Sequence, residues 1–162
     1  MRRVKLFPSL LSCLLWAPSL GAVASGPSCR DVSGYFLPHT AEESAEESPR
    51  AAGFEWLELW CDSSPGGEPR LEGRLRFDER LATGEFLTIP LSILTLAGQQ
   101  LSFSAVRKGG PEYRFTGRFL QSGRFEDVAE NETDVLAGVL EVLAGGKVAR
   151  TVEVHFHYTA GD

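Results

Sequence analysis

The chain has 162 residues, of which 43% are hydrophobic, and its 22 acidic residues outnumber its 16 lysines and arginines. This length predicts one domain with a core of useful size. The formal net charge of −6 disfavours nucleic acid as a partner, because a nucleic-acid-binding surface is normally basic.

The first 24 residues have the pattern of a secretory signal peptide. Basic residues at Arg2, Arg3 and Lys5 precede a mostly apolar stretch at 6–20, and Ala-Val-Ala at 22–24 fits a cleavage site. We therefore expect an exported protein, periplasmic or extracellular, with one mature domain over residues 25–162.

Two kinds of membrane anchor are alternatives to the signal peptide. A transmembrane helix is disfavoured because Pro8 and Pro18 interrupt a stretch shorter than the ~20 apolar residues that a span needs. A lipid anchor at Cys13 is a further alternative, since Leu-Ser-Cys at 11–13 faintly resembles the end of a bacterial lipoprotein signal.

Two cysteines, Cys29 and Cys61, remain in the expected mature chain. An oxidising compartment normally joins such a pair, so we expect a disulfide. Two free buried thiols are the alternative.

Strand patterns dominate the mature chain, and clusters of Gly, Pro, Asp and Ser separate them. Pro90 interrupts the fourth segment and there demands an edge, a bulge or a break. We expect eight strands, at 32–37, 54–61, 69–77, 85–93, 99–106, 112–120, 134–143 and 147–158.

Four of these strands contain an apolar residue, any residue, Gly, any residue and another apolar residue, centred on Gly34, Gly73, Gly117 and Gly138. Residues two apart share a face of a strand, so the glycines belong to the inner face. Glycines there indicate a curved sheet or space for a ligand. The sequence predicts an all-β, eight-stranded antiparallel up-and-down barrel, with a β-sandwich as the alternative. A hairpin of the first two strands would bring Cys29 and Cys61 together.

Two stretches between or across these strands have unusual composition. Residues 39–52 are rich in Glu, Ser and Ala and are expected to form a flexible acidic loop. Residues 86–106 carry no charge, but Pro90 and Gly98 argue against a membrane helix and favour two strands. Strands this apolar are candidates for an interface in a homo-oligomer.

The Gly34-Tyr35-Phe36 phrase, the Phe115-Thr116-Gly117 phrase and the eight-strand meander resemble the calycin group of lipocalins, fatty-acid-binding proteins and avidins. The resemblance implies a small barrel that binds one small, apolar ligand. It does not imply biotin binding, because Pro38 stands where avidins have an Asn that contacts biotin.

The second strand carries Phe54, Trp56 and Trp60 together with Glu58 on one face, and Leu57, Leu59 and Cys61 on the other. If the aromatic face points inward, Trp56, Glu58 and Trp60 form a ligand-stacking wall. Gly73, Gly117 and Gly138 would then leave room for the ligand. The alternative places Leu57 and Leu59 in the core and the tryptophans at an interface or rim.

The last strand places His155 and His157 on one side, two residues apart, with Glu153 on the same face. This spacing suits a zinc or copper ion, although a solvated outer face is the commoner explanation. His39 would approach the pair only in a favourable strand register.

No signature of an enzyme is present and no cofactor is predicted. The Asn131-Glu132-Thr133 triplet fits a glycosylation acceptor. The leading hypothesis is an exported, noncatalytic protein that holds a small hydrophobic or amphipathic ligand in a β-barrel. The alternatives are a filled barrel that acts through its outer surface, in an envelope complex or homo-oligomer, and a metal-binding or enzymatic protein that uses His155 and His157.

Overall fold

The computed structural model describes residues 26–40, 52–64, 66–125 and 133–159. The predicted signal segment with Cys13, residues 41–51 of the acidic loop, and Asn131 lie outside the described residues.

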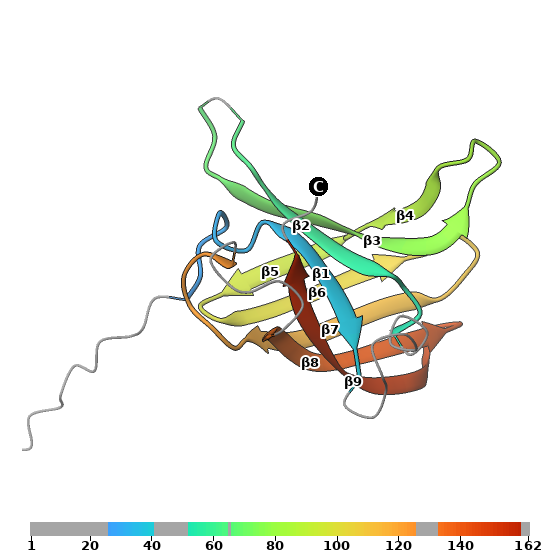
Figure 1. Cartoon of the computed structure of the whole chain (residues 1–162). Coiled ribbons are helices and arrows are strands. Elements are labelled where there is room, and N and C mark those ends of the chain that lie inside the picture. Colours follow the sequence, from blue (N-terminus) through green and yellow to red (C-terminus); the bar gives the residue numbers. More distant parts are fainter. Residues whose placement is uncertain (1–25, 41–51, 65, 126–132, 160–162) are drawn as a thin grey trace, which may run out of the picture.

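The described residues form one antiparallel sheet of nine strands, in the spatial order β4-β3-β2-β1-β9-β8-β7-β6-β5 (Figure 1). Neighbours in this order are consecutive in the chain except β1 and β9, which pair with each other. The strands are β1 (Gly34–His39), β2 (Trp56–Asp62), β3 (Arg70–Arg80), β4 (Phe86–Pro90), β5 (Ile93–Ala97), β6 (Gln100–Val106), β7 (Glu112–Phe119), β8 (Asp134–Ala144) and β9 (Lys147–Thr159).

The prediction of an all-β antiparallel meander is confirmed, but the expected number of strands is wrong. The segment expected at 85–93 ends at Pro90, and a separate strand follows over Ile93–Ala97. Proline has no N–H for a ladder and marks such a break. His39, which was assigned to the acidic loop, belongs instead to β1.

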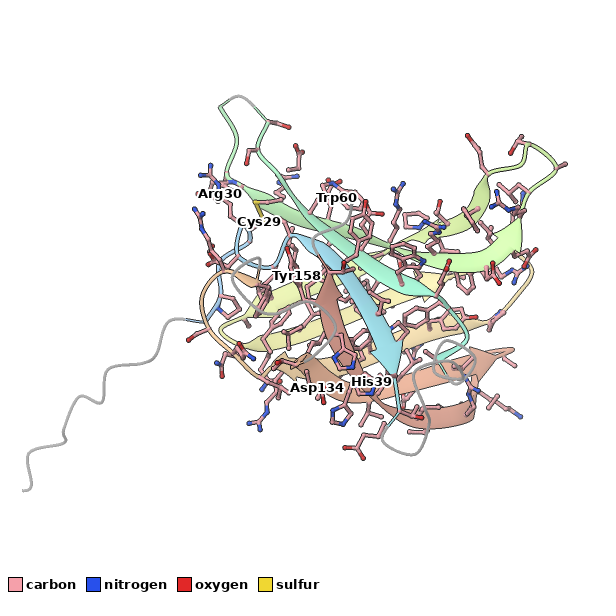
Figure 2. The ribbon with its side chains drawn as sticks, in the orientation of Figure 1. Cys29, Arg30, His39, Trp60, Asp134 and Tyr158 are labelled. Carbon is pink, nitrogen blue, oxygen red and sulfur yellow. A yellow bond between two sulfur atoms is a disulfide. The ribbon has the colours of Figure 1, made fainter. Side chains whose placement is uncertain are left out.

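The core lies on the concave face of the sheet, where aromatic and aliphatic side chains fill it (Figure 2). Phe115 makes ring contacts with Phe103 and Phe156, at centroid distances of 5.1 and 5.5 Å. Phe36 packs near Phe119 and Phe125 in the same cluster. Buried residues from every strand except the edge strand β5 share this one core, which requires the sheet to curl.

The four inner-face glycines lie beneath other side chains. A Cβ on Gly34 would collide with the Tyr158 ring, and one on Gly73 with Leu59 and Leu91. Gly117 and Gly138 are opposite each other in the β7–β8 register, and the Phe115 ring covers both. Large neighbours therefore occupy the space that these glycines leave.

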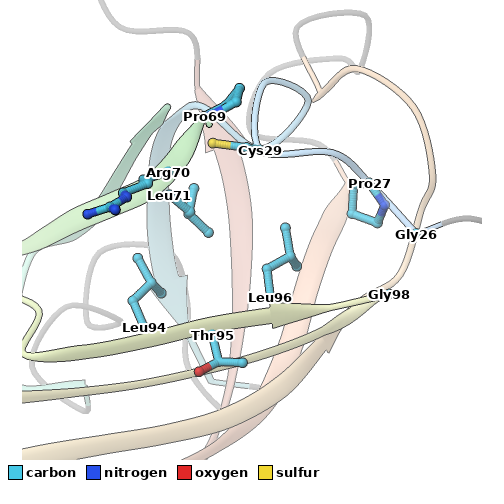
Figure 3. A pocket seen from close by; sticks show the side chains of 10 residues that line it. All are labelled: Gly26, Pro27, Cys29, Pro69, Arg70, Leu71, Leu94, Thr95, Leu96 and Gly98. Atoms are coloured by element: carbon cyan, nitrogen blue, oxygen red, sulfur yellow. The ribbon is translucent and has the colours of Figure 1, made fainter. Parts of the chain in front are cut away.

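The curl does not close into the expected barrel, because the edge strands β4 and β5 do not pair with each other. β4 and β5 are consecutive in the chain, which passes from the side of β3 to the side of β6 within two residues. Leu91 N–H donates to Gly73 C=O of β3 (2.9 Å), and Ser92 N–H donates to Ser104 C=O of β6 (2.8 Å). Before Gly73, β3 separates from β5. A groove of about 650 Å³ lies there, and Arg70, Leu71, Leu94 and Leu96 are among the residues that line it (Figure 3).

The predicted disulfide between Cys29 and Cys61 is present, with a Cα–Cα distance of 5.4 Å. It ties the segment before β1 to β2, as the hairpin of the first two strands requires. Among the described residues, no helix is long and apolar enough to cross a membrane.

Candidate functional site

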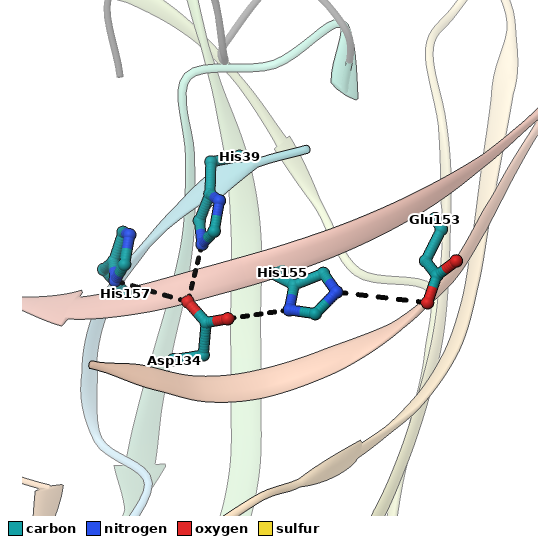
Figure 4. Close-up of polar contacts among 5 residues, drawn as sticks. All are labelled: His39, Asp134, Glu153, His155 and His157. Carbon is teal, nitrogen blue, oxygen red and sulfur yellow. Dashed lines mark hydrogen bonds and ion pairs between the residues drawn. The ribbon is translucent and has the colours of Figure 1, made fainter. Parts of the chain in front are cut away.

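The chain contains three histidines, and all three surround one carboxylate, that of Asp134 (Figure 4). His39 ends β1, His155 and His157 lie on β9, and Asp134 begins β8. Three neighbouring strands therefore build a single cluster, which we call the His–Asp cluster: His39, Asp134, His155 and His157.

Strand register brings these side chains together. His39 is opposite His155 in the β1–β9 pair, and Asp134 is opposite His157 in the β8–β9 pair. Phe156 between the two histidines is fully buried, so alternation directs His155 and His157 to the outer face. The strand register that is needed to bring His39 beside His155 and His157 is therefore present.

A β-bulge places Asp134 on that same face. Leu136 pairs with Phe156 and Asp134 pairs with His157, which leaves Val135 as one extra residue in β8. Val135 and Leu136 are both buried. A bulge changes the face on which the preceding side chains emerge, and here it turns Asp134 outward.

Each carboxylate oxygen of Asp134 forms a hydrogen bond with a histidine. Its Oδ1 is 2.6 Å from His39 Nε2, and its Oδ2 is 2.8 Å from His155 Nδ1. His155 Nε2 in turn lies 3.9 Å from Glu153, which is 80% exposed. The four side chains of the cluster are 20 to 32% exposed, so the cluster is half-buried and open to small solutes.

The ring of His157 is positioned by stacking. It stacks on that of His39, with centroids 4.1 Å apart and planes within 7°. Its Nδ1 is buried, lies 3.5 Å from Asp134 Oδ1 and has no hydrogen-bond partner. A buried ring nitrogen without a partner costs about 1–3 kcal/mol, and a ligand on that nitrogen would remove the cost.

The cluster favours the ionised form of Asp134. Partial burial acts to raise the pKa of this carboxyl, but the hydrogen bonds with His39 and His155 outweigh the burial, and the pKa lies below its usual value. A carboxylate with imidazoles beside it is a donor set for a divalent cation.

Asp134, His39 and His157 each offer one possible ligand atom, and these atoms lie within 4.8 Å of one another. Tetrahedral zinc with bonds of about 2.0–2.1 Å keeps its ligand atoms roughly 3.3 Å apart. The 3.5 Å between His157 Nδ1 and Asp134 Oδ1 already fits. The 2.6 Å between His39 and Asp134 must widen by less than an ångström. The His39 and His157 rings are stacked within 7° of parallel, and an ion lies in the plane of each imidazole that binds it, so at least one ring must also turn before both bind the same ion.

The other predicted site residues do not form an inner wall. Leu57 and Leu59 are fully buried, so Trp56, Glu58 and Trp60 lie on the outer face of β2. The Arg76 guanidinium lies 4.4 Å from the Trp56 ring centroid. Arg74 bonds Glu58 at 2.6 Å and lies over Trp60. The His–Asp cluster therefore includes neither these three residues of β2 nor the glycines that other side chains cover, Gly73, Gly117 and Gly138.

The chain matches no protein-family model, and no curated protein or solved structure matches it.

Proposed function

We propose that this chain is a metal-binding protein that holds one divalent transition-metal ion, with zinc as the reference ion, in the His–Asp cluster. The observation that carries the proposal is the convergence of all three histidines on Asp134 from three strands. A solvated outer face does not require such a convergence.

His39, His157 and Asp134 would bind the ion, since their donor atoms lie within 4.8 Å of one another. His155 would hold the second Asp134 oxygen, as outer-shell partners of metal-binding carboxylates do. Three protein ligands leave a coordination position for water or an exogenous group. Two imidazoles and a carboxylate suit Zn²⁺, and the Irving–Williams order makes Cu²⁺ a stronger binder at the same site.

Calorimetric titration of the metal-free protein with Zn²⁺ tests the proposal. We expect one Zn²⁺ per chain in the wild type. His39→Ala, His157→Ala and Asp134→Asn should each weaken binding by about tenfold or more, because each removes one of three ligands. Glu153→Gln is the matched control, since this exposed residue shares the face but approaches only His155. It should bind as the wild type does.

Absence of Zn²⁺ and Cu²⁺ binding in the wild type would overturn the proposal. Binding that survives all three ligand substitutions unchanged would also contradict it. Circular dichroism of each variant identifies those that fail to fold, and His157→Ala is the most informative because His157 makes no hydrogen bond through its Nδ1.

Export is part of the same proposal. The Cys29–Cys61 disulfide supports an oxidising compartment, and the signal-like segment at residues 1–24 supports secretion. Membership of the calycin group remains a proposal that rests on the short phrases quoted above. A small hydrophobic ligand inside the sheet is a weaker proposal, because aromatic side chains fill the described core.

A further inference from the structure

One wall of the groove in Figure 3 is the start of β3, whose main-chain groups no described strand pairs with on that side. Gly73 C=O accepts from Leu91 N–H, so Gly73 directs its main-chain groups away from β2. Alternate residues of an antiparallel strand direct these groups to the same side, so the N–H and C=O of Leu71 point into the groove. β4 pairs with β3 only from Arg74 onward and leaves Leu71 uncovered.

β5 forms the opposite wall, and its main chain faces the groove in the same way. Ala97 pairs with Gln100 across a two-residue turn, so Ala97 and Thr95 hydrogen-bond with β6. Leu94 and Leu96 then direct their N–H and C=O groups away from β6. Within the described chain, no strand pairs with this side of β5. Both walls of the groove therefore offer unused main-chain donors and acceptors.

The space between these walls is apolar and partly enclosed. The side chains of Leu71, Leu94 and Leu96 point into it (Figure 3) and are partly buried against the core. Gly26 packs so closely on Gly98 that a Cβ on Gly26 would collide with the main chain, and the segment before β1 thus bounds one end. The volume of about 650 Å³ lies within the ~300–1,000 Å³ typical of small-molecule sites. The groove can therefore enclose an apolar group of a small ligand.

Arg70 is the only charged residue among those that line the groove. It is opposite Asp62 in the β2–β3 register, but the Asp62 carboxylate accepts a hydrogen bond from Ser64 (3.0 Å), and Arg70 forms no ion pair within the described chain. Arg74, further along the same face of β3, is already bonded to Glu58. Arg70 is therefore available to the carboxylate of a ligand, with which arginine forms short, charge-assisted hydrogen bonds.

We propose that the groove binds the C-terminal end of a short apolar peptide. The last side chain of the peptide lies among the three leucines, and its terminal carboxylate binds Arg70. The peptide amides hydrogen-bond with the unused main-chain groups of β3 and β5, as in the addition of a strand to a sheet edge. Three separate features of the groove thus each match one part of the ligand.

A peptide fits these walls better than a hydrocarbon chain with a carboxylate does. Such a chain would contact the leucines and Arg70, but it would cover the main-chain donors and acceptors of both walls without pairing them, which is unfavourable. A strongly acidic peptide is disfavoured because the chain itself carries a formal net charge of −6. The site therefore selects an apolar peptide with one carboxylate at its end.

Amide NMR titration of the isotope-labelled protein tests this proposal, with acetyl-Leu-Leu as the probe. EDTA in the buffer keeps the His–Asp cluster free of metal and the test independent of it. We expect the amide signals of Leu71, Leu94 and Leu96 to shift on binding. The same peptide with an amidated C-terminus should bind about two- to fivefold more weakly, the range of an exposed ion pair. Arg70→Gln should weaken acetyl-Leu-Leu by the same factor and leave the amidated peptide unchanged.

Arg74→Gln is the matched control, since it removes the same charge from the same face of β3 outside the groove; it should bind both peptides as the wild type does. Decanoate, which has a carboxylate and an apolar chain but no amide, should bind more weakly than acetyl-Leu-Leu. The proposal would be overturned by groove amides that do not shift, by decanoate that binds as tightly as the peptide, or by an Arg70→Gln variant of unchanged fold that binds acetyl-Leu-Leu normally or loses both peptides equally.

Discussion

Asp134 shows how a single residue can be missed by strand alternation. Leu136, Gly138 and Leu140 predict the inner face of β8, and the same period assigns Asp134 to the core. The extra residue Val135 reverses that assignment, and no local pattern marked the bulge. His155 and His157 were predictable because they share a regular strand. His39 depended on register between β1 and β9, which a single sequence does not contain.

The pKa of Asp134 leads to a prediction about acid stability. Because its pKa is lowered in the folded chain, ionised Asp134 adds stability that is fully present above its unfolded pKa of about 3.9 and is lost as the pH falls through the lower folded value. Urea unfolding of metal-free wild type and Asp134→Asn should show a difference in unfolding free energy at about pH 5, where Asp134 is ionised in both the folded and the unfolded chain. The difference should shrink in more acidic solution. An equal difference at both ends of the pH range would contradict the role given to the two hydrogen bonds.

At the scale of elements, alternation predicted the strands with one face to the core most reliably. β3 and β7 alternate apolar and charged residues, and their expected bounds were close to those of the structure. The uncharged segment after Phe86 gave no such alternation. The segment 86–106 holds three strands where two were expected: the short edge strands β4 and β5, separated at Leu91 and Ser92, and then β6. Pro90 was the only local sign of the division between β4 and β5.

The close approach of β7 and β8 at Gly117 and Gly138 gives a prediction at the same scale. A Cβ at position 138 would meet Gly117 Cα, Thr116 C=O and the Phe115 ring, and Phe115 is itself fixed between Phe103 and Phe156. Gly138→Ala should therefore lower the free energy of unfolding by about 1–3 kcal/mol, which is typical of overpacking.

Urea unfolding measures this change, and Gly67→Ala in the β2–β3 turn is the control. A Cβ at position 67 meets only Ser64 C=O at 3.6 Å, so its effect should stay within about 0.5 kcal/mol. A Gly138→Ala variant as stable as the control would show that the two strands can separate at little cost.

For the whole molecule, the sequence predicted an antiparallel meander but not its closure. The β1–β9 pairing completes the order of strands, while the break after Pro90 leaves β4 and β5 unjoined. Closure of the barrel depends on the direction that the chain takes between β4 and β5, at Leu91 and Ser92. Strand periodicity carries no information about that direction. The same pairing of β1 with β9 positions the His–Asp cluster, so the candidate site follows from the long-range topology rather than from a motif.

X-ray absorption spectroscopy of the zinc-loaded protein tests the central claim most directly. The account predicts a four-coordinate ion with two imidazole ligands and oxygen donors, all at about 2.0–2.1 Å. Asp134→Asn should lower the fraction of protein that holds zinc, and Glu153→Gln should leave the spectrum unchanged. A zinc spectrum without imidazole scattering, or one that His39→Ala and His157→Ala leave unaltered, would contradict the assignment of the His–Asp cluster as a metal site.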